Sequence, residues 1–379
     1  MDFARRPILV FWEATRACML ACRHCRASAI PRPPAGELST EEAQRLLDRL
    51  AAFGRPAPVL VGTGGDVLMR HDLDALATRA AGLRLPLALA PSVTPLLSEQ
   101  RIRSLRRLGV RVSSISLDGA SASVHDRVRG VDGHFEQTIA AVRRLREQRI
   151  VVQLNTTVMA DTVDELPAVA GLAARLGAAI WELFFLVPVG RGRALGALSA
   201  EENEHVCHFL FDASRHGLVV RTVEAPFFRR IVAERLAGTP PPRDGLYPRL
   251  RKGLEDELGP PRSRPRAQTK GTRDGSGILF VGHDGTIAPS GFLPLSLGNV
   301  REHDPVEVYR EHTLLRRIRA ADFGGRCGSC GYRQLCGGSR ARAYAAHGDP
   351  LAEDPGCPYV PDRLGPAIRA DAPSATGAR

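Results

Sequence analysis

The sequence predicts an α/β fold in which helices cover a parallel sheet. Short apolar runs rich in β-branched residues alternate with segments of helical periodicity at nearly regular spacing. The apolar runs are continuous, which is typical of parallel strands buried on both faces. Six such units are too few to close an eight-stranded barrel. The expected strands are residues 7–14, 58–61, 85–90, 112–117, 151–158 and 180–187.

Two capping boxes mark helix starts between these strands. Ser39 with Glu42, and Ser199 with Glu202, place a hydroxyl and an acid three residues apart before apolar runs. Between residues 117 and 134 we expect a loop. The expected helices begin at residues 39 and 199, the second running to about 216, and also cover residues 71–83, 98–108, 134–148 and 163–176.

The rest of the chain changes in composition. The strand–helix units form a core domain over residues 7–223. A basic, proline-rich connector follows over residues 224–276, and its proline runs from residue 238 predict a mobile segment or a lid. Residues 277–360 hold a second group of cysteines and are expected to form a small second domain. Residues 361–379 are rich in Ala, Pro and Arg, which predicts a disordered tail.

Composition limits the function classes. No run of about 18 apolar residues occurs, and the N-terminus lacks the pattern of a signal peptide, so we expect neither a membrane segment nor secretion. Eight cysteines in 379 residues are too few for a disulfide scaffold, which favours metal binding in a reducing cytoplasm. The net charge of +11 indicates either a solvated basic surface or an anionic partner, and no nucleic-acid motif accompanies it.

Cys18, Cys22 and Cys25 form a C-x3-C-x2-C run directly after the first expected strand. A cubane iron–sulfur cluster normally takes four thiolates, so three leave one iron open to a small molecule. A zinc site or core cysteines are the alternatives, but structural zinc sites usually pair C-x2-C units and close all four positions.

This run resembles the signature of radical S-adenosylmethionine (SAM) enzymes. The resemblance implies a partial (β/α)6 TIM-like barrel and a [4Fe–4S] cluster whose open iron binds SAM. It also implies reductive cleavage of SAM to a 5′-deoxyadenosyl radical that abstracts a substrate hydrogen, so the cofactor carries the difficult chemistry. His24 stands where the family has an aromatic residue on the adenine.

Further SAM contacts follow from the same resemblance. Gly64, Gly65 and Asp66 stand where the family has Gly-Gly-Glu-Pro, so we expect the two glycines to allow close approach and Asp66 to hold the SAM ammonium. An ordinary tight turn is the alternative. Other expected contacts, each of which could instead be a plain strand end or capped loop, are Ser92, Ser116, Arg129 and Asn155.

Cys327, Cys330, Cys336 and Cys357 form a second group, C-x2-C-x5-C followed by a distant cysteine. Four thiolates can close a cubane cluster, and a zinc ribbon is the alternative. The pattern resembles the SPASM module of radical SAM enzymes, which in full binds two auxiliary clusters. Ser290 and the pair Ser339-Arg340 stand where further cysteines are expected, so one fully ligated auxiliary [4Fe–4S] cluster is implied.

The resemblance is nearest to radical SAM enzymes of haem, haem d1 and pyrroloquinoline quinone maturation. It implies an oxidoreductase acting on a small molecule such as a tetrapyrrole, with an electron donor such as flavodoxin or ferredoxin. Modification of a ribosomally made peptide is one alternative. A non-catalytic iron–sulfur electron-transfer protein is another, although a SAM-contact motif has no use in a pure electron carrier.

Overall fold

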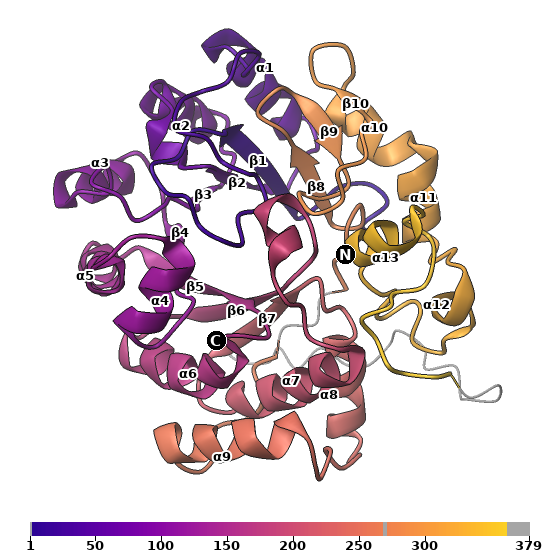
Figure 1. Ribbon diagram of the computed structural model, residues 1–379. Coiled ribbons are helices and arrows are strands. Elements are labelled where there is room, and N and C mark those ends of the chain that lie inside the picture. Colours follow the sequence, from indigo (N-terminus) through magenta and orange to yellow (C-terminus); the bar gives the residue numbers. More distant parts are fainter. Residues whose placement is uncertain (1, 268–270, 362–379) are drawn as a thin grey trace.

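The computed structural model describes residues 2–267 and 271–361. A single ten-stranded sheet, in the order β10-β9-β8-β1-β2-β3-β4-β5-β6-β7, curves through the molecule without closing. Helices lie outside the curved sheet, as Figure 1 shows, so the sheet has a covered convex face and a concave inner face. The expected disordered tail over residues 361–379 falls almost entirely outside the described residues.

The six expected strands are all present and parallel to their neighbours. In β4 and β6 every second residue is buried and the residues between them are partly exposed, whereas the other strands contain consecutive buried residues. A seventh parallel strand, which the sequence did not predict, pairs with β6 and contains Arg221. The barrel strands are β1 Leu9–Thr15, β2 Val59–Gly64, β3 Leu87–Leu89, β4 Val112–Ser116, β5 Val151–Val158, β6 Ile180–Phe185 and β7 Val219–Val223.

Both predicted capping boxes are formed at the starts of α1 and α7. The loop expected before residue 134 is wrong, because residues 122–129 form a helix that ends at Gly130 with a left-handed φ of 73°. The helices of this half are α1 Thr40–Ala51, η1 Val67–Met69, α2 Leu73–Gly82, α3 Glu99–Arg107, α4 Ala122–Arg129, α5 His134–Glu147, η2 Val163–Glu165, α6 Leu166–Arg175, η3 Gly190–Ala194 and α7 Ala200–Ala213.

The proline-rich connector contains two helices, α8 Phe228–Leu236 and α9 Leu246–Leu258. Helix α9 buries Leu246, Tyr247, Leu250 and Leu254 and packs against α6 and α7. The expectation of a mobile segment or lid is therefore wrong for this stretch, because apolar residues at helical spacing outweigh the surrounding prolines.

Residues after the connector extend the same sheet. Strand β8, Ile278–Val281, pairs in parallel with β1, and β9 and β10 continue the sheet in antiparallel fashion. Beyond them lies a helical region that carries the second cysteine group (Figure 1). The remaining elements are β9 Thr286–Ala288, β10 Gly298–Asn299, α10 Pro305–Glu311, α11 Thr313–Arg319, α12 Gly325–Ser329 and α13 Arg340–His347. Within the described residues, no helix is long and apolar enough to cross a membrane.

Candidate active site

The first three cysteines lie together in the loop that follows β1, which we call the cluster loop (residues 16–30). Cys18 and Cys22 are buried with Leu20 and Ala29, and Cys25 packs against them. Backbone N–H groups point at the sulfurs, from Leu20 to Cys18 across 3.4 Å and from Ala29 to Cys25 across 3.5 Å. These free thiols and N–H donors fit the ligation of an iron–sulfur cluster, whose sulfurs are tuned by such hydrogen bonds.

The Gly64-Gly65-Asp66 turn fixes this loop. A Cβ on Gly64 would lie 2.2 Å from the Thr15 oxygen, and one on Gly65 would lie 2.2 Å from the Ala17 oxygen. The N–H groups of Gly65 and Asp66 donate to those same two oxygens at 2.8 and 2.7 Å. The close approach that the glycines permit is therefore to the backbone leading into the cluster loop.

Asp66 is fully buried, and both of its oxygens have protein partners. The Oδ1 atom accepts from the N–H groups of Leu68 and Ser92, and Oδ2 accepts from the Thr94 hydroxyl at 2.9 Å. Burial raises the pKa of this carboxyl, against the opposing effect of those hydrogen bonds. The Ser92 hydroxyl in turn lies 3.5 Å from the Cys18 sulfur. The structure thus connects Asp66 to the cluster loop through Ser92.

His24 and Arg129 meet at one buried carboxylate, Asp118, at the end of β4. The Nε2 atom of His24 lies 2.9 Å from Asp118 Oδ2, and Arg129 forms an ion pair with the same oxygen. Arg129 also donates to the Cys22 sulfur across 3.5 Å. Burial disfavours the Asp118 charge, but Arg129 and His24 outweigh it and hold its pKa well below the usual range. Asp118 therefore orients His24 and Arg129, which the sequence analysis predicts to contact SAM.

Two uncharged histidines, His125 and His134, form a chain of polar contacts that begins at the Asp118 backbone. The Asp118 N–H donates to Nδ1 of His125, whose Nε2 lies 2.9 Å from Nδ1 of His134. Burial, followed by the Arg129 charge, lowers the pKa of His125 to about 3, so this ring stays uncharged at neutral pH. A neutral ring can accept the Asp118 hydrogen bond, which a doubly protonated ring could not.

A polar row crosses the concave face at one level. Strand register places Ser116, Asn155, Glu182 and Arg221 next to one another on β4, β5, β6 and β7. All four are half-buried, whereas their strand neighbours are covered by helices. Gln153 donates to Asn155 at 2.8 Å and to Glu182 at 2.7 Å. The row therefore places Ser116 and Asn155 together, and it adds a charged pair that the sequence alone did not indicate.

Arg191 is another residue that sequence reasoning missed. It follows Gly190, whose φ of 55° and close approach to the Cys25 oxygen leave no room for a Cβ. The Arg191 side chain donates to the carbonyl oxygens of Cys22 at 2.9 Å and Ala29 at 3.0 Å. The segment that follows β6 thus holds the cluster loop in place through Arg191.

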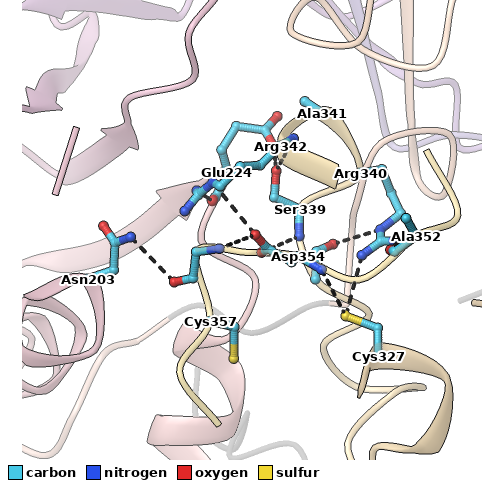
Figure 2. Close-up of polar contacts among 12 residues, drawn as sticks. Asn203, Glu224, Cys327, Ser339, Arg340, Ala341, Arg342, Ala352, Asp354 and Cys357 are labelled. Carbon is cyan, nitrogen blue, oxygen red and sulfur yellow. Dashed lines mark hydrogen bonds and ion pairs between the residues drawn. The ribbon is translucent and has the colours of Figure 1, made fainter. Parts of the chain in front are cut away.

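The second cysteine group surrounds one cavity. Cys327, Cys330, Cys336 and Cys357 all line it, and N–H groups of Tyr332, Gly338 and Asp354 each donate to one of the sulfurs at 3.4 Å. Figure 2 shows Cys327 receiving further contact from Arg340. In the described part of the chain, no three Cys, His, Asp or Glu side chains are close enough to hold a single metal ion. Thiols that wall a cavity suit a cubane better than one zinc ion.

These thiols need a cation to ionise. Burial raises the pKa of Cys336 to about 11 and that of Cys357 to about 12. At neutral pH both are protonated without a metal, and binding of iron displaces the protons. By contrast Cys207, on α7, is completely buried in the apolar core.

Comparison with known proteins supports the same assignment. Residues 12–173 match the family model described as the Radical SAM superfamily. The AdoMet-dependent heme synthase of Oleidesulfovibrio alaskensis is 38% identical over 95% of this chain and 89% of its own length. The pre-heme d1 synthase of Dinoroseobacter shibae is 30% identical over 97% of this chain and 89% of its length.

The fold has solved counterparts as well. The crystal structure of Streptococcus suis SuiB bound to precursor peptide SuiA superposes with a TM-score of 0.68, at 14% identity, over 93% of this chain and 76% of SuiB. The predicted α/β fold with an open parallel sheet is therefore confirmed, and the family match supports the predicted SAM-binding [4Fe–4S] cluster and SAM itself as cofactors. The chain belongs to the radical SAM superfamily of enzymes and has the architecture of its SPASM-type members.

Proposed function

We propose that this enzyme abstracts a hydrogen atom from a carboxylate-bearing tetrapyrrole during maturation of a haem-type cofactor. The observation that carries the proposal is the 38% identity, along 95% of the chain, to a protein named as a heme synthase. The net charge of +11 suits an anionic substrate. The cluster and SAM together supply the radical, and the protein must bind, orient and shield the reactants.

The residues around the cluster loop divide these tasks. Cys18, Cys22 and Cys25 are the proposed cluster ligands, and Arg129 places a positive charge beside them. We also keep His24, Gly64, Gly65, Asp66, Ser92, Ser116, Arg129 and Asn155 as proposed SAM-site residues. Asp118 and Ser92 hold this set in place through the contacts described above.

Arg221 is the residue we assign to a substrate carboxylate. It is half-buried on the concave face, its Nε atom is buried without a partner, and among the described residues its guanidinium forms no hydrogen bond and no ion pair within 4 Å. Glu182, on the adjacent strand, acts on it only at longer range. A partly desolvated guanidinium without a partner is stabilised by a bound carboxylate, which it can contact through two N–H groups.

The test uses anaerobic enzyme loaded with both clusters, SAM, dithionite and iron coproporphyrin III as the tetrapyrrole. We expect the tetrapyrrole to bind, to increase 5′-deoxyadenosine formation and to change in mass. A precursor-type peptide replaces the tetrapyrrole in a parallel reaction. Tetrapyrrole-independent SAM cleavage with no tetrapyrrole binding would overturn the substrate assignment, and a mass change in the peptide would favour the rival class.

Matched arginine variants test the anchor. Arg221→Gln should weaken tetrapyrrole binding by about tenfold or more, because a charged hydrogen bond contributes roughly 1.5–3 kcal/mol. Arg221→Lys should retain part of the affinity through its charge. Arg243→Gln, which removes an exposed arginine of the connector, should bind as the wild type does.

We further propose that a flavodoxin or ferredoxin supplies the electron and that the enzyme works in the cytoplasm. All eight cysteines are free thiols in the structure, in keeping with a reducing compartment. We include neither nucleic acid nor a membrane among its partners. Reduction of the SAM-binding cluster by purified flavodoxin, compared with ferredoxin, tests the donor.

A further inference from the structure

The two serines that stand in place of cysteines meet the same buried acid pair. Ser339 donates from Oγ to Glu224, which directly follows β7, and Ser290 forms a side-chain hydrogen bond with Asp274. Ala341, two residues beyond Ser339, donates its N–H to Asp274 at 3.1 Å, so the start of α13 holds both carboxylates. Ser290 and Ser339 are 49 residues apart in sequence, so their meeting at one polar cluster is a property of the fold. Figure 2 shows Glu224 and Ser339 facing each other.

The acid pair, Glu224 and Asp274, is almost completely buried, with 8% and 7% of each residue exposed. Two ionised carboxylates are acceptors only and repel each other, so burying both at the start of one helix favours retention of one proton between them. Among the described residues no arginine forms an ion pair within 4 Å with either carboxylate, and Arg342 and Arg340 favour their ionisation only from longer range. Arg342 donates to the main-chain oxygen of Glu224 and pairs with Asp354 at 3.7 Å, and Arg340 is directed at Cys327 and the carbonyl oxygens of Pro350 and Ala352.

We propose that a single proton shared by Glu224 and Asp274 takes the place of a second auxiliary iron–sulfur cluster in this enzyme. The hydroxyls of Ser290 and Ser339 complete the site as donors to the pair. Oxygen side chains and a shared proton do not fit a cubane, whose ligands are thiolates. The inference concerns the cofactor content and is independent of which substrate the enzyme takes.

Burial supports a retained proton. It raises the pKa of Glu224 well above the usual range, with the Asp274 charge as the next contribution, and it raises the pKa of Asp274 as well. Groups this close titrate together, so the proton belongs to the pair and to neither residue alone.

The acid pair also connects the barrel to the remaining auxiliary site. Glu224 has a left-handed φ of 59°, a strained conformation for a residue with a side chain, and it lies at the end of a barrel strand. Beyond Ser339, the Ser339 N–H donates to Asp354 at 2.8 Å, and the Asp354 N–H donates to the Cys327 sulfur at 3.4 Å. Glu224 is therefore a positioning residue that three successive hydrogen bonds join to Cys327, a proposed cluster ligand.

Infrared spectra of the cluster-loaded enzyme at about pH 8 test the shared proton, since a free acidic side chain is ionised there. We expect a protonated-carboxyl carbonyl band that shifts in heavy water. Glu224→Gln and Asp274→Asn should each lower its intensity by one carboxyl group, because an amide can donate without a shared proton. Ser339→Ala should shift the band without lowering its intensity.

Glu353→Gln is the matched control, because it removes a partly exposed carboxylate that contacts Arg326, next to Cys327. It should leave the band unchanged. Full intensity in either amide variant, or about twelve irons per wild-type chain instead of about eight, would overturn the proposal. If Glu224→Gln fails to fold, Asp274→Asn and the iron count still decide.

Discussion

Arg129 donates a hydrogen bond from its guanidinium to the sulfur of Cys22 across 3.5 Å while it pairs with the buried Asp118. A positive charge beside a cluster thiolate favours the reduced, more negative cluster. Arg129→Gln should therefore lower the reduction potential of the SAM-binding cluster by on the order of 50–100 mV, since 59 mV corresponds to a tenfold change for one electron.

Redox titration followed by electron paramagnetic resonance measures this shift. Arg127→Gln is the control, because Arg127 lies two residues away on the same helix but is exposed. An unchanged potential in Arg129→Gln would mean that this arginine serves only the fold or SAM.

Asp118 predicts a pH-dependent stability. Its folded pKa lies well below the unfolded value of about 3.9, so its stabilisation is complete above that pH and is lost as the pH falls through the folded pKa. Asp118→Asn should lower the free energy of unfolding at pH 7 by about 3–5 kcal/mol, as for breaking a buried ion pair. The difference from wild type should shrink below about pH 4.

Urea unfolding at a series of pH values measures both effects. Asp132→Asn removes a nearby exposed carboxylate and should change stability little. A wild-type advantage that stayed constant down to pH 2 would contradict the linkage.

One variant can distinguish the two roles considered for Asp66, which are holding the turn and binding SAM. The sequence predicts that Asp66 holds the SAM ammonium, and the structure gives the same carboxylate three protein donors. Asp66→Asn should lower the free energy of unfolding by about 1–3 kcal/mol, because the amide nitrogen cannot accept those bonds. Isothermal titration of SAM into the same samples tests the ammonium contact. A tenfold loss of affinity with unchanged stability would assign Asp66 to SAM and not to the turn.

Each of the two cysteine groups should hold its own cluster, so removing one group should leave the iron of the other in place. Wild type should hold about eight irons per chain, and the Cys18, Cys22, Cys25 triple alanine variant about four, with no 5′-deoxyadenosine formation under dithionite. The matched control is Cys207→Ala, which removes a fully buried core thiol and should keep both clusters. Mössbauer spectra and sulfide assays provide the count. Stoichiometric zinc at Cys327–Cys357 would contradict the prediction of an auxiliary iron–sulfur cluster.

Local sequence patterns predicted most of the strands and helices of the fold. The capping boxes at Ser39 and Ser199 form as predicted, because their hydrogen bonds span only three residues. The cysteine spacing likewise located the cluster loop. Helix α4 was missed because it is short and begins with weak helix formers, Ala122 aside, without a side-chain cap.

The contacts that the sequence did not reveal join distant segments. Arg191 reaches Cys22 across 169 positions, and Ser339 reaches Glu224 across 115. The residues around Arg191 and Ser339 form no local pattern that predicts these partners. Both contacts depend on which strand ends the folded sheet brings together. Arg221 shows the same limit, because only the register of β6 and β7 places it beside Glu182 on the concave face.

The pairing of β1 with β8 has a consequence for synthesis of the chain. Leu9 pairs with Ile278, so one edge of β1 remains open until 269 further residues (278 − 9) have been added. At about 5–20 residues per second, the ribosome needs on the order of 10–50 s to supply them. During that interval the nascent chain presents an unpaired apolar strand edge directly ahead of Cys18, Cys22 and Cys25. Such an edge can pair with another chain, so β1 is most exposed to aggregation before β8 is made.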